Sequence, residues 1–508
     1  MDNKVVLAQR WVNAAYGAVP GYTRCPEDGE AGPSTWYALI RALQHELGIT
    51  ALSDNFGPGT LGKLEERGGV RPSEQNRGIV GVVQAGLLCH GYAAGEIDGT
   101  FGPRAQAAAA ALRFDAGLSP APNGAMEPKL LKALLSPDSH VLVPGGDRRV
   151  RAVQRWLNGT YAERKNFLVI ACDGVPSRDV YFALYLAVQF ELGLSDEQAT
   201  GNFGPGTRAG LKEHAVGEGD TSRWVRLYSA SLIVNGLGTF TDFFDRSLVR
   251  ATEEFQDFAA LPRTGRGDYP TWALLLASNG DPDQPAAACD TATTITPARA
   301  KALHAAGYRV VGRYLDERPN GTLDKEIKPG ELKTIFEHGL QVFPISQYYG
   351  GDRDYFTEAQ GRQDARDAHT AALRNGFRPG TVIFFAVDYD ATQDEVDSHV
   401  VPYFRGVVAG LDAAGGRYRH GVYGSRNVCT QVTKQTKARW SFVAGMSIGY
   451  SGNLGFGLPE NWAFNQVRTL TTGDGDGKIE IDANTCRPGT DAAVSSVDET
   501  DGRPARGA

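Results

Sequence analysis

Hydrophobic positions in the first half of the chain recur with the three- to four-residue spacing of amphipathic helices. In 79–91, for example, Val80, Val83 and Leu87 fall on one side of a helix. The stretch at 95–102 is too rich in glycine for a helix and is typical of a tight loop. The pattern predicts an all-α region built from units with the order helix, turn, helix, turn, helix.

This helical region contains a duplication. The sequence QRW at 9–11 recurs at 154–156, and NFGPGT at 55–60 recurs at 202–207. A second unit follows each copy, and its two versions are separated by the same shift as the two QRW segments. Regular internal repeats of this kind indicate small stacked modules. We therefore expect two pairs of related modules, here called A and B, then A′ and B′.

The domain boundaries follow from these repeats and from a change of pattern after residue 281. A linker rich in Pro, Gly and Asp separates the two pairs of modules, and beyond 281 short apolar runs alternate with amphipathic stretches. We predict modules A and B at 1–72 and 73–140, modules A′ and B′ at 148–217 and 218–281, a strand-and-helix domain at 285–490, and a disordered tail at 491–508.

Eight apolar runs in the C-terminal domain predict strands. They occupy residues 287–290, 308–315, 340–349, 381–390, 419–425, 439–446, 462–467 and 478–484. Eight strands with helices between most of them, over about 200 residues, predict an α/β domain of the (β/α)8 TIM-barrel type. An open, doubly wound sheet is the alternative fold.

Acidic residues lie on three of these strands, near the ends where a (β/α)8 barrel places its chemistry. Asp290 ends the first strand, Asp388 and Asp390 end the fourth, and Asp482 lies on the last. Residues two apart on a strand face the same side, so Asp388 and Asp390 should point together and one should have a raised pKa. A protonated carboxyl and a carboxylate are the two groups that glycoside hydrolysis needs. The alternative is that Asp390 caps the following helix.

Further polar and aromatic residues are expected around the same mouth. Tyrosines can stack on sugar faces, and Arg313 can pair with a carboxylate of a ligand. The alternatives are that tyrosines fill the barrel rim and that Arg313 pairs with an aspartate of the core. The expected substrate-binding residues are Arg313, Tyr314, Gln347, Tyr348, Tyr349, Tyr423, Gln466 and Asn484.

Charge and composition narrow the partners. The formal net charge of −7 provides no basic surplus for nucleic acid. No stretch of about 18 apolar residues predicts a membrane span. The N-terminus has no basic and apolar leader, so we expect synthesis in the cytoplasm and action at the cell wall or outside the cell after lysis or specialised export.

The six cysteines include no CxxC pair, so we expect neither a structural metal nor a cofactor. The first and last strands are neighbours in a closed barrel, which would allow a disulfide between Cys289 and Cys486. Buried free thiols are the alternative.

Two resemblances to known families bear on the predicted helical modules and on the predicted barrel. The IDGTFG loop at 97–102 with its flanking helices resembles the peptidoglycan-binding domain of wall hydrolases, although module B′ departs from it with TDFFD at 241–245. Asp290, FFAVDYD at 384–390, YGS, WAFNQV and IDANT resemble glycoside hydrolase family 25 muramidases. They resemble more closely a related bacterial family known only as glycoside-hydrolase-like.

The second resemblance implies a peptidoglycan hydrolase of the muramidase type. Asp390 takes the place of the family's glutamate as proton donor, with Asp388 or Asp290 as the charge stabiliser and Asp482 beside them. Aspartate is one methylene shorter than glutamate, and a misplacement of about 1 Å can lower a rate greatly. The alternatives are an inactive barrel that binds wall glycan and a component delivered by a phage-like particle. The expected partners are peptidoglycan and a secretion or injection apparatus.

Overall fold

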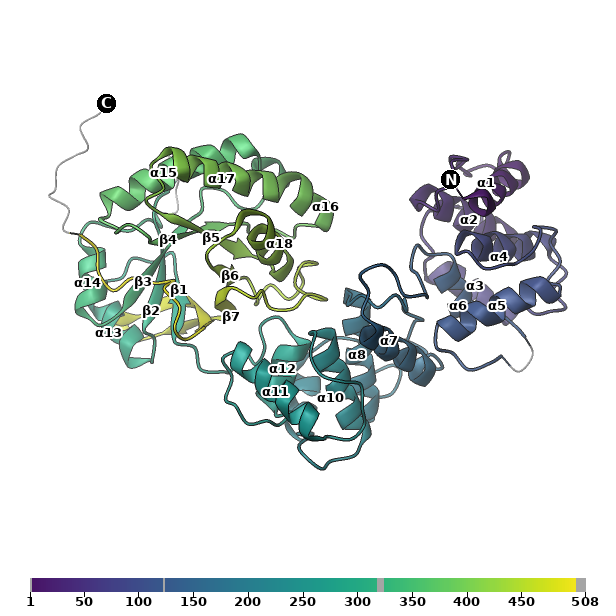
Figure 1. Ribbon diagram of the computed structural model, residues 1–508, viewed down its shortest axis with the longest axis horizontal. Helices are drawn as coiled ribbons and strands as arrows, with labels where there is room; N and C mark the ends of the chain where they lie inside the picture. Colours follow the sequence, from purple (N-terminus) through teal and green to yellow (C-terminus); the bar gives the residue numbers. More distant parts are fainter. Residues whose placement is uncertain (1, 122–123, 318–323, 499–508) are drawn as a thin grey trace. The chain divides into compact units, whose positions relative to one another are not determined.

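The computed structural model describes residues 2–121, 124–317 and 324–498 and divides into two compact units, Met1–Asn202 and Phe203–Ala508 (Figure 1). Each unit is described by itself. In its described residues the first unit consists of helices α1 (Asn3–Tyr16), α2 (Pro33–Glu46), α3 (Pro58–Arg67), α4 (Arg77–Cys89), α5 (Pro103–Asp115), α6 (Pro128–Leu134), α7 (Arg148–Tyr161) and α8 (Arg178–Glu191).

Polar caps and prolines set the helix starts in this unit. The side chain of Asn76 accepts a hydrogen bond from the backbone N–H of Ile79 at the start of α4. Helices α2, α3, α5 and α6 each begin at a proline, whose missing N–H costs nothing in the first turn. One hydrophobic core extends from Ala8 to Leu135 and joins α1–α6. The residues predicted as modules A and B therefore share a single core.

A buried glutamine holds a glycine loop at equivalent places in the repeats. Nε2 of Gln84 donates to Oδ1 of Asp98 over 2.8 Å, and Oε1 of Gln84 accepts from the backbone N–H of Gly99 over 3.0 Å. Gln9 in α1 and Gln154 in α7 hold their own Asp-Gly loops with the same two bonds. The repeated sequence thus encodes a repeated loop anchor.

The second unit begins with α9 (Pro205–Lys212), α10 (Arg223–Val234), α11 (Arg246–Phe258) and α12 (Tyr269–Leu276). In α10, Ser229 replaces the glutamine anchor. Its hydroxyl donates to the carbonyl of Thr241 over 2.8 Å and accepts from the N–H of Thr241 over 3.2 Å. The shorter side chain brings a different loop against the helix, which agrees with the altered sequence at 241–245.

Eight strands then close a barrel in the order of the sequence. All eight overlap the predicted runs, although most are shorter. They are β1 (Ala288–Asp290), β2 (Val310–Tyr314), β3 (Gln341–Ser346), β4 (Val382–Ala386), β5 (Arg419–Gly424), β6 (Ser441–Val443), β7 (Trp462–Thr472) and β8 (Ile479–Cys486).

Helices cover the outside of this barrel (Figure 1). They are α13 (Pro297–Ala305), α14 (Glu331–Glu337), α15 (Glu358–Arg374), α16 (Gln393–Glu395), α17 (Val401–Ala413) and α18 (Arg426–Thr436), with a π-helical turn at Val396–Val400 between α16 and α17 and 3-10 turns at Arg353–Tyr355 and Gly475–Gly477.

The last strand departs from the expected (β/α)8 pattern. Strands β1–β7 run parallel to one another, whereas β8 is antiparallel to both β7 and β1. A 3-10 turn rather than an α-helix joins β7 to β8, so the chain returns directly as a hairpin. The expectation of a regular eighth β/α unit was wrong, and β8 enters the barrel from the end at which the other strands finish.

Aromatic side chains fill the barrel interior. Phe343, Phe384, Phe442 and Phe464 belong to one buried cluster, and the rings of Phe343 and Phe464 are stacked 4.2 Å apart. Alternate residues of the same strands, such as Phe385, belong to the separate core between strands and helices. The interior is therefore packed with side chains, as in other barrels of this size.

One further expectation was wrong. Residues 491–498 are not a free tail, because Val494 forms a β-bridge with Val342; residues 499–508 lie outside the described part. Of the two alternatives left open for Cys289 and Cys486, the structure has the free thiols. Cys289 lies in the core between strands and helices, whereas Cys486 packs against the interior cluster, so the two thiols occupy different layers.

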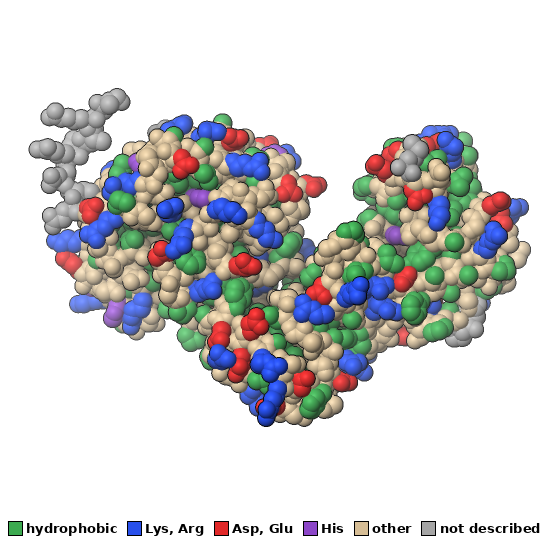
Figure 2. Space-filling model, viewed as in Figure 1, with side chains coloured by type: hydrophobic (Ala, Val, Ile, Leu, Met, Phe, Trp, Pro, Cys, Tyr) green, Lys and Arg blue, Asp and Glu red, His purple; other side chains and the backbone are tan. Residues whose placement is uncertain are grey.

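The surface shows no dominant charge in the view of Figure 2, where Lys and Arg side chains are interspersed with Asp and Glu. Among the described residues, no helix is both long and apolar enough to cross a membrane.

Candidate active site

Two carboxyl groups meet where β1 and β8 lie side by side at the mouth, the barrel end at which β1–β7 finish. Asp290 ends β1, and its Cα is paired with that of Asp482 in the antiparallel register. Directly opposed residues of an antiparallel pair project from the same face, with Cβ atoms about 5 Å apart. Asp290 is only 5% exposed, whereas Asp482 is partly exposed. Asp482 is thus the member of the pair that solvent or a ligand can reach.

Two amide groups hold the buried carboxyl of Asp290. Its Oδ1 accepts from Nδ2 of Asn484 over 2.8 Å and from Nε2 of Gln466 over 3.0 Å. Oε1 of Gln466 in turn accepts from the hydroxyl of Tyr423 over 2.9 Å. Burial, and next the charge of Asp482, raise the pKa of Asp290 to about 7, although the two amide donors oppose this shift. Asp290 therefore keeps its proton up to near neutral pH, and burial also raises the pKa of Asp482.

Asp388 lies beyond the end of β4, which stops at Ala386. Its backbone N–H donates to the carbonyl of Gly350 over 2.8 Å, and its Oδ2 accepts from Nε2 of Gln347 over 3.3 Å. Desolvation by the surrounding mouth raises the pKa of Asp388, while the Gln347 bond and the charge of Lys325 lower it. Asp388 is exposed to solvent, and the positive charge of Lys325 favours its carboxylate form. Asp388 is therefore well suited to be the ionised carboxyl of the mouth.

Lys325 is a member of the site that the sequence did not reveal. It is only 8% exposed; its Nζ lies 4.3 Å from the centre of the Tyr314 ring and donates to Oε1 of Gln347 over 3.3 Å. Burial lowers the pKa of Lys325, and the charges of Glu317 and Asp388 oppose that effect. Lys325 comes from an irregular segment between β2 and α14, where neither periodicity nor a motif marks it.

Asp390 is bonded to the loop between β6 and β7. Its Oδ1 accepts from the backbone N–H of Ser451 over 2.5 Å and from the Ser451 hydroxyl over 2.7 Å. Because β4 ends at Ala386, Asp388 and Asp390 do not lie on a strand, and the alternation argument that placed them on one face does not apply. Asp390 is exposed and anchors this loop at the mouth.

Arg313 does not belong to the mouth. Its side chain is fully buried, its Nε donates to Oε1 of Glu331 over 2.7 Å, and its Nη1 donates to the carbonyl of Thr291 over 2.7 Å. Arg313 alternates along β2 with Tyr314, which packs against the interior cluster, so Arg313 points into the helix layer. The expectation that it meets a ligand carboxylate was wrong, because it forms an ion pair with α14.

The tyrosines separate into two groups. Tyr314 and Tyr423 lie among the carboxyls, and burial, followed by the nearby aspartates, raises the pKa of both. Tyr348 instead directs its hydroxyl to Oδ2 of Asp316 over 3.4 Å, and Tyr349 is 45% exposed beside the ring of Tyr355. Tyr314 and Tyr423 therefore line the site, and Tyr349 is exposed at its rim. Tyr348 instead holds Asp316, in the segment that follows β2.

The mouth thus combines a proton-holding carboxyl pair, a separate carboxylate beside a lysine, and aromatic walls. General acid–base work on an acetal oxygen uses one protonated carboxyl and one carboxylate, and the mouth offers candidates for both. Among the described residues, no three His, Cys, Asp or Glu side chains are grouped so as to hold a metal ion.

Comparisons with known proteins agree with this architecture. A family model described as "Rv2525c-like, glycoside hydrolase-like domain" matches residues 301–486, and one described as "FadG/YbfG, PGDB-like domain" matches residues 143–276. The chain is 46% identical over 501 residues to the uncharacterized protein FadG of Bacillus subtilis (strain 168), covering 98% of this chain and 87% of FadG. The chain belongs to the FadG/YbfG family. It is also 38% identical over 509 residues to the uncharacterized protein YbfG of the same strain, covering 98% of this chain and 69% of YbfG.

The solved structures that match this FadG/YbfG member are less similar to it in sequence than FadG and YbfG are. A crystal structure of the Mycobacterium tuberculosis Tat-secreted protein Rv2525c in complex with L-tartrate is 22% identical, with a TM-score of 0.33, and covers 40% of this chain and 96% of that chain. An uncharacterized B. stearothermophilus protein is 18% identical, with a TM-score of 0.29, and covers 41% of this chain and 99% of that chain.

The family match defines a glycoside hydrolase-like domain at residues 301–486. That segment includes Asp388, Asp390 and Asp482, whereas Asp290 precedes it. Asp290 nevertheless belongs to the same barrel, because β1 closes it between β2 and β8.

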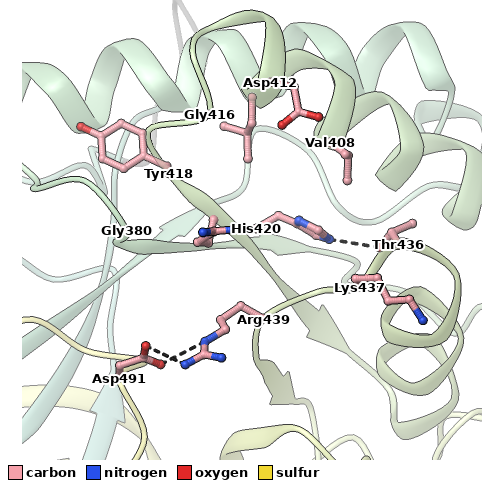
Figure 3. A pocket seen from close by; sticks show the side chains of 12 residues that line it. Gly380, Val408, Asp412, Gly416, Tyr418, His420, Thr436, Lys437, Arg439 and Asp491 are labelled. Carbon is pink, nitrogen blue, oxygen red and sulfur yellow. Dashed lines mark hydrogen bonds and ion pairs between the residues drawn. The ribbon is translucent and has the colours of Figure 1, made fainter.

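A separate pocket of about 630 Å³ lies at the opposite end of the barrel (Figure 3). Residues preceding β4 and β6, the start of β5 and the C-terminal parts of α17 and α18 line it. In Figure 3 the guanidinium of Arg439 faces the carboxylate of Asp491, and Nε2 of His420 lies 3.1 Å from the hydroxyl of Thr436. None of the predicted site residues lines this pocket, so it is distinct from the mouth.

Proposed function

We propose that the barrel is a glycoside hydrolase that cleaves β-1,4 links in the glycan strands of peptidoglycan. The observation that supports this most directly is the Asp290–Asp482 pair, in which burial keeps a proton on two facing carboxyls near neutral pH. A third carboxyl, Asp388, lies in the same mouth beside Lys325. The glycoside hydrolase-like family match over 301–486 agrees with this chemistry.

The proposed reaction uses one proton donor and one base. Asp482, the more exposed member of the pair, donates a proton to the glycosidic oxygen as the bond from that oxygen to the anomeric carbon breaks. Asp388 accepts a proton from water as the water oxygen bonds to the anomeric carbon. Asp290 stays buried opposite Asp482 in the antiparallel register, where burial and the charge of Asp482 keep its own pKa raised. This assignment moves the acid from Asp390, the position that the resemblance implies, to the pair between β1 and β8.

The helical repeats are proposed to hold the enzyme at the wall. The loops anchored by Gln9, Gln84 and Gln154 present the same backbone pattern at separate places in the first unit. Several weak sites on one chain raise the local concentration at a polymer without one tight site. The Ser229 loop in α10 departs from the pattern, so the proposal assigns wall contact to the glutamine-anchored loops.

The test is release of reducing sugar from purified peptidoglycan by the full chain. Asp482→Asn and Asp388→Asn should each lower release at least a hundredfold, whereas Asp476→Asn, an exposed aspartate in the turn between β7 and β8, should leave it unchanged. Unchanged release in the Asp482 and Asp388 variants would overturn the assigned roles. A wild-type chain that releases no sugar from any wall type would overturn the hydrolase.

A second candidate is a barrel that binds wall glycan without turnover. One observation favours it: Asp390, at the position of the muramidase glutamate, is shorter and is bonded to Ser451. Co-sedimentation of the chain with walls, without sugar release, would support this candidate over the hydrolase.

A further inference from the structure

The segment that follows α12 is bound to the barrel by buried hydrogen bonds. After α12, the hydroxyl of Ser278 donates to the carbonyl of Gly445 over 2.6 Å, and Nδ2 of Asn279 donates to the carbonyl of Val467 over 3.2 Å. The carbonyl of Ser278 accepts from Nδ2 of Asn465 over 3.1 Å. Ser278 and Asn279 are 4% and 7% exposed, so water does not compete for these bonds.

Arg426 extends this junction to the loop between β6 and β7. The residue begins α18 and is only 2% exposed. Its Nη1 donates to the carbonyl of Phe456 over 2.9 Å, and its Nη2 donates to the carbonyl of Ser278 over 3.3 Å. One guanidinium therefore connects the helical segment with the loop whose other side carries Ser451, the partner of Asp390.

The junction lies next to the residue that holds Asp290. Asn465 and Val467, both bonded to the helical segment, flank Gln466 on β7, and Gln466 donates to Asp290. The parts pack closely around Gly445. A Cβ added to Gly445 would lie 2.2 Å from Oδ1 of Asn465 and 2.7 Å from the carbonyl oxygens of both Gln466 and Ser278.

We infer that Ser278 and Asn279 are positioning residues for the mouth: the segment that follows α12 fixes β7 and the β6–β7 loop, and thereby the amide that Gln466 donates to Asp290. The consequence for catalysis rests on the proposed function. The working unit of the barrel then includes α12 and 277–279, and it does not begin at the predicted boundary of 285.

The physical reason is that the junction satisfies buried backbone carbonyls. Removing the Ser278 hydroxyl or the Asn279 amide leaves the carbonyl of Gly445 or Val467 without that donor in a water-free place. The nearby backbone must then open toward water or shift to find another donor. Either response loosens β7 and the loop that follows β6, because these are the segments directly bonded.

The experiment is hydrogen–deuterium exchange on the full chain, for the wild type and for Ser278→Ala and Asn279→Ala. Both variants should exchange at least fivefold faster in peptides covering 444–467, with α15 and α17 unchanged. The matched control is Asp283→Ala, which removes an exposed ion pair with Arg468 near the same junction and should leave exchange in 444–467 as in the wild type. Unchanged exchange in both variants, or faster exchange spread equally over the barrel, would overturn the inference.

A second readout separates positioning from simple stability. In the sugar-release assay, Ser278→Ala and Asn279→Ala should lower kcat with little change in KM and shift the pH limb set by the Asp290–Asp482 pair, and Asp283→Ala should do neither. A loss confined to KM, or one that follows thermal stability in all three variants, would overturn a positioning role. Since exchange needs no substrate, failure of the proposed hydrolase activity would leave the first readout decisive.

Discussion

Asp290 and Asp482 are paired across β1 and β8 because β8 runs antiparallel to its neighbours. In a regular eighth β/α unit, the last strand would be parallel to the others, and its C-terminal residues would lie at the mouth. The hairpin reverses this order, so Asp482 reaches the mouth while Asn484 lies deeper, opposite Ala288, where it donates to Asp290. The reversed strand thus provides both the second carboxyl and one of the amides that hold the first.

The raised pKa of Asp290 predicts a pH-dependent stability. Folding raises the pKa of Asp290 from 3.8 to about 7, so the folded state binds more protons than the unfolded state between these values. The free energy of unfolding contributed by Asp290 therefore falls as pH rises through this window and is constant outside it. For a shift of this size the decrease is about 4 kcal/mol. Asp290→Asn, which cannot ionise, should lack this part of the decrease.

Urea denaturation between pH 4 and pH 8 measures this effect. The stability of the wild type relative to Asp290→Asn should fall as pH rises and then level off above the pKa of the pair. Asp476→Asn is the control, since that side chain is exposed. Parallel curves for wild type and Asp290→Asn would show that the aspartate is already ionised at low pH.

Lys325 should set the acid limb of activity. Its charge opposes the desolvation that raises the pKa of Asp388, and the proposed base must be ionised. Lys325→Met should therefore move the acid limb of kcat/KM for sugar release upward by about one pH unit. Lys325→Arg keeps the charge and should keep the limb near its wild-type position. An unmoved limb in Lys325→Met would remove Lys325 from the control of Asp388.

The strands of the barrel, and Asp290 and Asp482 at its mouth, were predictable because each depends on a local pattern in the sequence. Apolar runs located all eight strands, and Asp290 and Asp482 stood out as acids on apolar strands. The direction of β8 was not predictable, because a hairpin turn and a short crossover leave the same alternation in the sequence. Lys325 was missed for a related reason: its burial results from Tyr314 and Gln347, which belong to other segments.

The crossing of α15 and α17 should depend on two glycines. A Cβ added to Gly361 would lie 2.0 Å from the carbonyl oxygen of Tyr403, and one added to Gly406 would lie 2.0 Å from that of Glu358. Backbone cannot yield as a side chain does, so Gly361→Ala must push the helices apart, at a cost of about 3 kcal/mol. Calorimetry should show a lower melting temperature for the barrel unit.

The control for this substitution is Gly62→Ala in α3, where no atom lies within 4 Å of the added Cβ. That change should stabilise the first unit by about 0.5–1 kcal/mol, because alanine loses less backbone freedom in a helix. An equal melting temperature for Gly361→Ala and the wild type would mean that the two helices can separate at little cost.

The glutamine anchor of the repeats gives a last prediction. Gln84→Ala removes the donor to Asp98 and leaves the partly buried N–H of Gly99 without its acceptor, so the first unit should lose about 1–2 kcal/mol in denaturant unfolding. The control is Gln75→Ala, an exposed side chain bonded to the carbonyl of Ser73, which should change stability by less than about 0.5 kcal/mol. Hydrogen exchange should rise in 95–102 for Gln84→Ala only. If both variants behave alike, the repeated glutamine is a marker of shared ancestry and not the support of the loop.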